Sequence, residues 1–234
     1  CSSVPMLLMR KKANYFFIST YLPVFKELKL QIKLGQFPSI FKSSPACKKT
    51  KAEQRVWTLG KQKYIGEFES LVRDLIPRHL PINYVEGFTQ LIKTAQSTVW
   101  PTNPEVIFTS NAHIGNDVFK VWAAEKREKN GATLVIGQHG GYTGTTELTS
   151  FEDHEYSISD RFCTWGWVKK DKPKLRPLGN IKTLGKQLQT DSSGGAVLVE
   201  FAMTRQSLRM HATPISSQWL DYFETQCALY AALP

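Results

Sequence analysis

The clearest structural pattern in this chain is EVIFTSNAHIGNDVFKVWAAEKREKNGATLVIGQHGG, residues 105–141. It begins and ends with short apolar runs that stop at polar or glycine residues, as buried strands do. Between these runs, residues 115–131 place apolar side chains at helical spacing and finish on a glycine. A strand, a helix and a second strand in this order predict a βαβ unit with parallel, buried strands. We therefore expect an α/β fold.

Further elements are expected on both sides of this unit. Short apolar and aromatic runs predict strands at 14–20 and 161–165. Apolar residues at helical spacing predict helices at 22–37, 61–75 and 82–96, and residues 42–54 read as a loop.

The composition changes after the last of these strands. Residues 169–194 are rich in charge, proline and glycine, which is typical of a linker. The run AVLVEFAMT at 196–204 then predicts a fresh buried strand, and residues 216–233 predict a helix. We expect a first domain at 1–168, a linker at 169–194 and, at 195–234, the start of a second α/β domain that is truncated within its first units.

The overall composition indicates a globular protein. Hydrophobic residues make up 41% of the 234 residues, and no apolar run approaches the roughly 20 residues of a membrane span. The four cysteines are far apart and form no CxxC pair, so they indicate neither a disulfide framework nor a zinc ribbon. A reducing, cytoplasmic location fits this pattern.

The net charge of +10 is concentrated near the N-terminus. Residues 1–78 hold 15 Lys and Arg against 5 Asp and Glu, whereas residues 79–234 hold 15 of each kind. Three interpretations stay open: a solvated face, peripheral contact with an anionic membrane, and nucleic-acid binding. No helix-turn-helix, RNP or zinc-finger pattern supports the last of these, so we expect no nucleic-acid partner.

Polar side chains collect where the two strands of the βαβ unit end. The segment QHGGYTGT, residues 138–145, follows directly on the second strand, and its paired glycines let a ligand approach the main chain. Ser110, Asn111 and His113 follow the first strand. Ligands of parallel α/β sheets bind beyond the carboxyl ends of the strands, so we expect these residues to share one crevice with His139.

Four chemistries come into question for this crevice. A phosphate-binding loop would show GxxxxGK[ST] or GxGxxG, and neither is present. A metal site built from His139, His154 and nearby carboxylates lacks a recognised spacing. A nucleophilic Cys163 competes with a buried structural thiol in a strand. The fourth is general acid–base catalysis by His139 with help from the carboxylates of FEDHE, residues 151–155, and its alternative is a histidine that only caps a turn.

The remaining candidates each have a purely structural alternative. Asp160 either belongs to the crevice or forms a local turn, and Trp165 either stacks on a sugar or base or packs in the core. Thr204 and Arg205 follow the strand expected in the second domain. There Arg205 either meets a phosphate or lies in solvent at the start of a helix.

Several of these segments together resemble a known family. They are IGQHGGYTGT (136–145), EDHEYSISDRFCTWGW (152–167), PLGN (177–180) and GGAVLVEF (194–201) with Arg205 beyond it. The chain resembles, from about residue 10 to 234, a family of transferases found in bacterial surface-carbohydrate biosynthesis loci. The Gln-His-Gly element is also similar to one in capsule-polysaccharide and polyglycerolphosphate transferases. The resemblance implies a GT-B-like pair of Rossmann-like domains that face each other across a cleft.

The resemblance also implies roles for individual residues. The first domain would bind the acceptor, with His139 as the general base that deprotonates its hydroxyl group. Thr204 and Arg205 would bind the donor phosphate. No metal or other cofactor is expected, because helix N-termini and basic side chains stabilise the departing phosphate in this fold and the sequence has no Asp-x-Asp motif. The residues expected to contact the substrates are Asn111, Gln138, Gly140, Gly141, Tyr142, Asp153, His154, Glu155, Asp160 and Trp165.

The sequence therefore predicts a glycosyltransferase or a related group transferase. It would use a nucleotide-activated sugar and a lipid-linked or saccharide acceptor to build a surface polysaccharide or glycolipid, in the cytoplasm or on the inner face of the membrane. Because most of the donor domain would lie beyond residue 234, we expect these residues alone to be inactive. The alternative is a non-enzymatic carbohydrate-binding or scaffold domain of a polysaccharide assembly system.

Overall fold

The computed structural model describes residues 9–41, 45, 47, 49–60, 66–146, 149–187, 189, 191–195, 197–200 and 218–233. The chain divides into two compact units, Cys1–Lys186 and Gln187–Pro234. No helix in the described part of the chain is long and apolar enough to cross a lipid bilayer.

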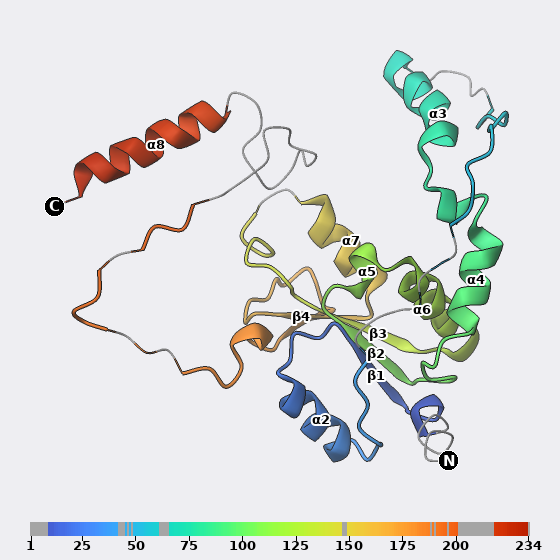
Figure 1. Cartoon of the computed structure of the whole chain (residues 1–234), viewed down its shortest axis with the longest axis horizontal. Helices are drawn as coiled ribbons and strands as arrows, with labels where there is room; N and C mark the ends of the chain where they lie inside the picture. The colour runs from blue at the N-terminus through green and yellow to red at the C-terminus, as the bar shows by residue number, and fades with distance from the viewer. Residues whose placement is uncertain are drawn as a thin grey trace. The chain divides into compact units, whose positions relative to one another are not determined.

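A parallel sheet organises the first unit (Figure 1). Its strands are β1 (Tyr15–Ile18), β2 (Val106–Thr109), β3 (Thr133–Gly137), β4 (Arg161–Thr164) and β5 (Leu175–Pro177), and they lie side by side in sequence order. Every pairing is parallel, so the predicted α/β class is confirmed and the domain is Rossmann-like. In doubly wound sheets the ligand binds where the strand order reverses. The order does not reverse among these five strands, so the topology alone does not locate a ligand site along their carboxyl ends.

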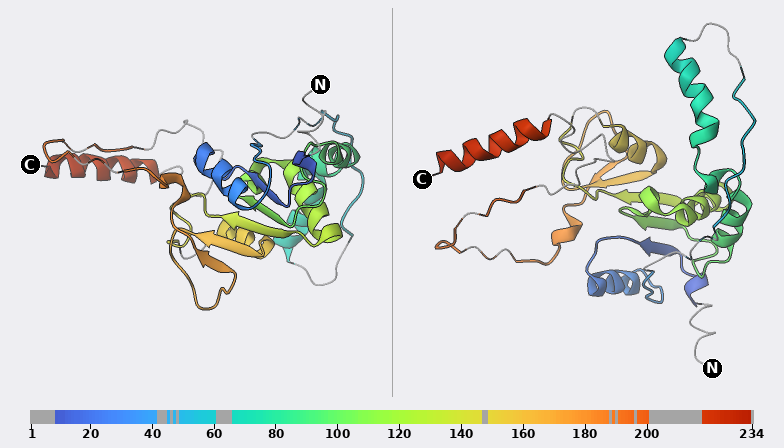
Figure 2. Two further views of the ribbon diagram at one scale, coloured as in Figure 1. Left: turned by 90° about the horizontal axis from the view of Figure 1, so that it is seen from below. Right: turned by 45° about the horizontal axis from the view of Figure 1, so that its top comes forward.

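Helices connect the strands. They are α2 (Val24–Lys33), α3 (Glu67–His79), η1 (Ile82–Tyr84), α4 (Phe88–Gln96), α5 (Ala112–Gly115), α6 (Asp117–Asn130), α7 (Ser150–Ile158), η2 (Ile181–Thr183) and, in the second unit, α8 (Gln218–Ala232). Figures 1 and 2 show α2 on one side of the sheet and α5, α6 and α7 on the other.

The predicted elements of the first unit are found with altered bounds. The helix expected at 82–96 is divided into η1 and α4 by a turn at Gly87, where a Cβ atom would lie 3.1–3.3 Å from Thr50, Asn83 and Ile82. Helix α7 and strand β5 were not predicted. Strand β5 lies inside the stretch expected to be a linker, and it has only three residues and ends on Pro177, which hides it from a periodicity test.

One face of the sheet carries the hydrophobic core. Alternate strand residues point to it and form cross-strand rows such as Phe16, Ile107 and Leu134. These rows pack against α4, α6 and the turn between α4 and β2. The packed aromatic side chains of this core are Phe16, Phe41, Trp100, Phe119 and Trp122.

The opposite face of the sheet is covered less completely. Phe17 and Phe108, which are paired across β1 and β2, point to this face. Helix α2 and the segment around η2 lie over it and leave an apolar groove of about 330 Å³. The groove is lined chiefly by Phe17, Leu22, Leu30, Phe108, Ile181 and Leu184.

The described part of the second unit contains one regular element, the predicted helix α8. The strand expected at 196–204 is absent at residues 197–200, where Val197 and Val199 are each 86% exposed; the rest of it lies outside the described residues. An apolar run needs a paired neighbour to form a strand, and the described residues of this unit provide none.

Candidate functional site

Side chains from three strand ends meet at the carboxyl edge of the sheet. Asn111, after β2, donates through Nδ2 to the hydroxyl of Tyr21, after β1, at 2.6 Å. Ser110 donates through Oγ to the carbonyl of Thr20 at 3.1 Å. Ser19 and Tyr21 have φ angles of 51° and 62°, a left-handed backbone that non-glycine residues rarely adopt. Residues with such strained backbone are found more often at functional sites than elsewhere, so they indicate a functional site at this edge.

Two histidines and one buried carboxylate form the centre of this edge. Glu155 on α7 is fully buried and accepts a hydrogen bond from Nε2 of His113, on α5, at 2.8 Å. The same oxygen, Oε1, lies 3.4 Å from Nδ1 of His139, two residues beyond β3. The latter contact is an ion-pair distance without the alignment of a full hydrogen bond. Both expected histidines of the crevice, His113 and His139, are therefore brought together by Glu155.

His139 presents its two ring nitrogens to different surroundings. Nδ1 is buried against Glu155, whereas Nε2 makes no hydrogen bond in the described part of the chain, and the side chain as a whole is 19% exposed. Phe151 and Tyr142 flank the ring edge-on, at centroid distances of 5.4 and 6.0 Å. A partly exposed histidine with one nitrogen against a carboxylate and the other free of partners in the described part of the chain has the arrangement of a general base.

The charge on Glu155 is maintained in spite of its burial. Burial alone would raise the pKa of this carboxyl group, but the contacts with His113 and His139 outweigh it and hold the pKa below its usual value. Its second oxygen, Oε2, is buried and has no hydrogen-bond partner among the described residues.

The glycine-containing segment after β3 is held in place by Gln138. Its side-chain amide donates to the carbonyls of Gly140 and Thr143 and accepts from the backbone of Trp165 and the indole of Trp167. Because these bonds occupy both ends of the amide, Gln138 positions the segment and links it to the loop after β4. Trp165 also donates through its indole to the carbonyl of Gln138 at 3.1 Å.

The aromatic side chains of this segment lie next to glycines. A Cβ atom at Gly140 would meet the ring of Tyr142 at 3.1 Å, and one at Gly141 would lie 3.8 Å from the ring of Trp165. Tyr142 is 36% exposed; its partial burial, and next the charge of Glu155, raise the pKa of its hydroxyl group. Side-chain-free positions at 140 and 141 therefore leave room for aromatic packing beside His139.

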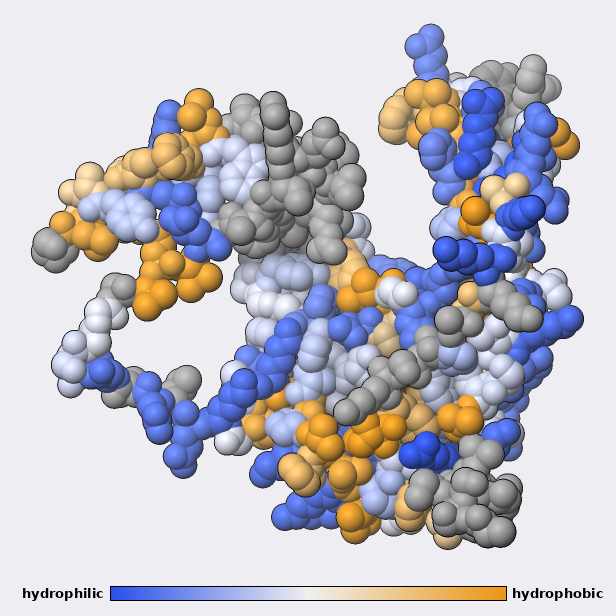
Figure 3. Space-filling view, in the orientation of Figure 1, coloured by the Kyte–Doolittle hydropathy of each residue, from blue (hydrophilic) through white to orange (hydrophobic). Residues whose placement is uncertain are grey.

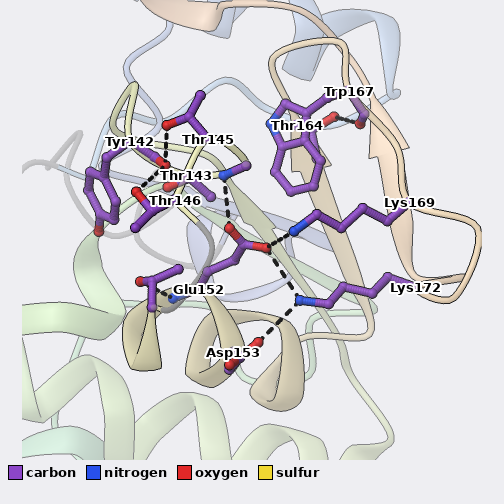
Figure 4. A network of polar contacts seen from close by, with 12 residues as sticks. Tyr142, Thr143, Thr145, Thr146, Glu152, Asp153, Thr164, Trp167, Lys169 and Lys172 are labelled. Atoms are coloured by element: carbon purple, nitrogen blue, oxygen red, sulfur yellow. Dashed lines mark hydrogen bonds and ion pairs between the residues drawn. The ribbon is translucent and has the colours of Figure 1, made fainter.

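Helix α7 is fastened to the glycine segment by Glu152 (Figure 4). Its Oε2 accepts from the backbone of Gly144 at 2.8 Å, and its Oε1 forms ion pairs with Lys169 and Lys172 at 3.1 and 3.3 Å. The sequence grouped Glu152 with the other carboxylates of residues 151–155 as a possible helper of His139. The role of Glu152 is structural, because these contacts fix the helix that carries Glu155.

Three of the predicted contact residues lie away from His139. Asp153 is 72% exposed and pairs with Lys172 (Figure 4). Asp160 precedes β4 at the amino edge of the sheet, where it binds Arg127 at 2.9 Å and the backbone of Leu134 at 2.7 Å. These contacts tie β3, β4 and α6 together and do not belong to the crevice. Thr204 and Arg205 lie outside the described residues.

His154 is the third predicted contact residue that lies away from His139. It borders a separate cavity of about 490 Å³ between α6 and α7. The buried ring of His113 also reaches this cavity, together with Phe151. The rest of the wall is mainly apolar and includes Phe119, Ala123, Leu134 and Ile158. The cavity thus lies behind the His113–Glu155 pair, on the core face of the sheet.

The positions of the described side chains support neither a nucleophilic cysteine nor a metal site. Burial raises the pKa of the Cys163 thiol, which keeps it protonated and suits a structural cysteine. Within the described ranges, no group of three or more His, Cys, Asp or Glu side chains is arranged to hold a metal ion.

A Rossmann-like sheet with a carboxylate-backed histidine at its carboxyl edge is an arrangement suited to group transfer. The family model of the LIC12162 family transferases matches residues 2–234, so this chain belongs to that family and is a transferase. The resemblance to a transferase family that the sequence indicated is confirmed. Comparisons with curated proteins and with solved structures gave no match.

Proposed function

We propose that this transferase moves a glycosyl or related group from a nucleotide-activated donor to an acceptor hydroxyl, and that His139 is the general base. The observation that carries the proposal is the environment of His139 at the carboxyl edge: Nδ1 lies against buried Glu155, and the side chain is 19% exposed. A GT-B-like pair of domains, with the donor phosphate bound by Thr204 and Arg205, completes the proposal.

The reaction follows from this arrangement. The acceptor hydroxyl gives its proton to Nε2 of His139 while its oxygen attacks the donor carbon, and the bond from that carbon to the phosphate oxygen breaks. The electron pair leaves with the nucleotide, and the positive charge on the imidazole is stabilised by Glu155. Gln138 keeps the segment that carries His139 at a fixed position.

The proposed setting is the assembly of a surface polysaccharide or glycolipid on the cytoplasmic side of a membrane. Its support is the sequence resemblance together with the membership in a transferase family. Acceptors of this kind are lipid-linked or oligosaccharide chains, and both offer a hydroxyl group to a base.

The test is nucleotide release by the complete protein from CMP-, UDP-, GDP- and CDP-activated sugars, with membrane extract as the acceptor. We expect release from one donor, and a loss of about 10²- to 10⁴-fold in the His139→Ala variant, the usual contribution of a general base. His79→Ala is the matched control, since His79 is exposed at the end of α3 and should leave the rate unchanged.

Folding is compared by circular dichroism, so that loss of activity is separated from loss of protein. A folded His139→Ala variant with the original rate would remove His139 from the mechanism. Absence of release from every donor, combined with saturable carbohydrate binding, would favour the scaffold alternative.

A further inference from the structure

Helix α2 buries polar side chains and exposes several apolar ones, the reverse of an ordinary surface helix. Its polar residues Glu27 and Gln31 are buried against the protein, whereas Phe25 is 85% exposed and Ile32 is 61% exposed. A surface helix normally buries its apolar stripe and exposes its polar one. The reversal leaves a large apolar area facing away from the core.

The inward side of α2 is fixed by hydrogen bonds. Glu27 accepts from the hydroxyl of Thr20 at 2.6 Å, and Gln31 exchanges bonds with both the carbonyl and the amide of Ser39, at 2.9 and 2.8 Å. Buried polar groups are costly unless they are paired, so a rotated helix would lose these partners. The outward direction of the apolar residues is therefore a specified feature of the fold.

The outward side of α2 combines apolar residues with lysines. At about 100° per residue, Phe25 and Ile32 lie within about 20° of each other, and Lys29 and Lys33 follow on one side of them. Val24 lies on their other side, next to the buried stripe. All five are exposed, and the helix exposes no acidic residue, since its single carboxylate is the buried Glu27. Figure 3 shows hydrophobic and hydrophilic residues side by side over the position of α2.

The surface continues onto the segment around η2. Leu178 and Leu184 are exposed there, and Lys182 and Lys186 add two further cations of the same unit. A Cβ atom at Gly185 would lie 3.6 Å from Cε of Lys26, which places this segment against α2. We call the outer side of α2 and residues 178–186 the α2 surface.

We propose that the α2 surface binds an anionic lipid membrane, with Phe25 and Ile32 among the acyl chains and the lysines at the headgroups. Interfacial helices bind membranes through such an apolar stripe beside lysines, and anionic lipids attract each lysine electrostatically. A second copy of the chain would bring lysines against lysines, which is repulsive, so the charge favours an anionic occupant.

The position of α2 connects this surface with the catalytic edge. Tyr21, which is bonded to Asn111, lies three residues before Val24, and Lys182 stands 4.3 Å from the centre of the Tyr21 ring. A membrane bound along α2 therefore lies near the crevice that holds His139. From such a membrane a lipid-linked acceptor would reach the crevice. This step rests on the proposed function, whereas the membrane binding itself does not.

The test measures binding of the whole protein to vesicles of phosphatidylcholine alone or with roughly 30% phosphatidylglycerol, by flotation. Binding to the anionic vesicles is expected to fall at least about 100-fold in Phe25→Ser/Ile32→Ser, since two apolar side chains leave the acyl chains. In Lys29→Gln/Lys33→Gln it is expected to fall about 25-fold, at about five-fold per lysine. The controls are Phe68→Ser, on α3, and Lys49→Gln/Lys51→Gln, in the basic loop; their positions are equally exposed, and binding should change less than about two-fold.

The outcomes separate this inference from the proposed function. Equal losses in the α2 and control variants, equal binding to neutral vesicles, or no binding at all would each overturn it, as would a stable dimer that Phe25→Ser/Ile32→Ser dissociates. Nucleotide release to a water-soluble acceptor is expected to stay unchanged in Lys29→Gln/Lys33→Gln. If Lys29→Gln/Lys33→Gln loses both nucleotide release and vesicle binding, the substitutions damage the fold, which circular dichroism would show. The vesicle binding of Phe25→Ser/Ile32→Ser then decides the test.

Discussion

Glu155 is the side chain that holds the candidate site together. It is buried, it touches both His113 and His139, and its pKa lies below the usual value. A carboxylate in this position does two things: it orients the base, and it stabilises the positive charge that the base acquires. Its removal should therefore affect the free energy of unfolding and the reaction rate together.

The stability effect of Glu155 has a definite pH dependence. Because the folded pKa is lowered, its contribution is present above the unfolded pKa of about 4.3 and is lost as the pH falls through the folded pKa below it. We expect Glu155→Gln to lower the free energy of unfolding by about 2 kcal/mol at pH 7, and this difference to shrink below pH of about 4. Urea unfolding between these pH values measures it.

Asp153 supplies the matched control, since it is a carboxylate two positions away on the same helix. It is 72% exposed and, among the described residues, its carboxylate pairs only with Lys172, so Asp153→Asn should cost less than about 1 kcal/mol. An equal loss in both variants, or a Glu155→Gln deficit that does not depend on pH, would show that Glu155 is not ionised as described.

The sequence indicated His139 correctly as a residue at a strand end, but it did not distinguish among the carboxylates that follow. The reason is that the sequence analysis treats residues 151–155 as a group of carboxylates and predicts no helix there, whereas the structure has helix α7. In a helix, residues three apart share a face, and Glu152 and Glu155 are the two that point inward while Asp153 points to solvent. The role of each carboxylate follows from the helical geometry.

Helix α7 has a start signal that the sequence does contain. Thr149 and Glu152 have the spacing of a capping box, and the hydroxyl of Thr149 accepts from the backbone of Glu152 at 3.3 Å. The side chain of Glu152 then turns to Gly144 in place of the cap. Strand β5 carries no comparable signal, because a three-residue strand shows no periodicity and only its pairing with β4 reveals it.

The turn between β3 and α7 depends on Gly144. Its φ angle is +85°, and a Cβ atom there would clash with the indole ring of Trp167. We expect Gly144→Ala to lower the free energy of unfolding by about 1–3 kcal/mol, because it combines left-handed strain with overpacking. It should also weaken catalysis, since the bond from Gly144 to Glu152 fixes the helix that carries Glu155.

Thermal unfolding and nucleotide release measure the two effects. Gly115→Ala is the comparison, because a Cβ atom at Gly115 meets nothing within 4 Å and its φ angle is not in the left-handed region. A Gly144→Ala protein as stable as Gly115→Ala would show that the turn adapts without cost.

The two units differ in how much of their apolar surface is buried. The βαβ core that the pattern at 105–141 predicted has two rows of buried strand residues under Trp122 and Phe119. The described part of the second unit has no such support: no residue of α8 is buried, and Leu220, Phe223 and Tyr230 are all more than half exposed. The sequence predicted α8 because its periodicity is local, whereas the strand expected before it depended on partners that local sequence does not supply.

This difference in burial predicts two different responses to hydrogen exchange. Amides of β2 and β3 should exchange only through global unfolding, because both strands are paired on each side and buried on one face. Helix α8 has 15 residues, a length at which an unsupported helix is marginal in water, so its amides should exchange within about ten-fold of an unstructured peptide. Protection of α8 equal to that of β3 would mean that another surface covers its apolar side chains, and the exchange of that surface would identify it.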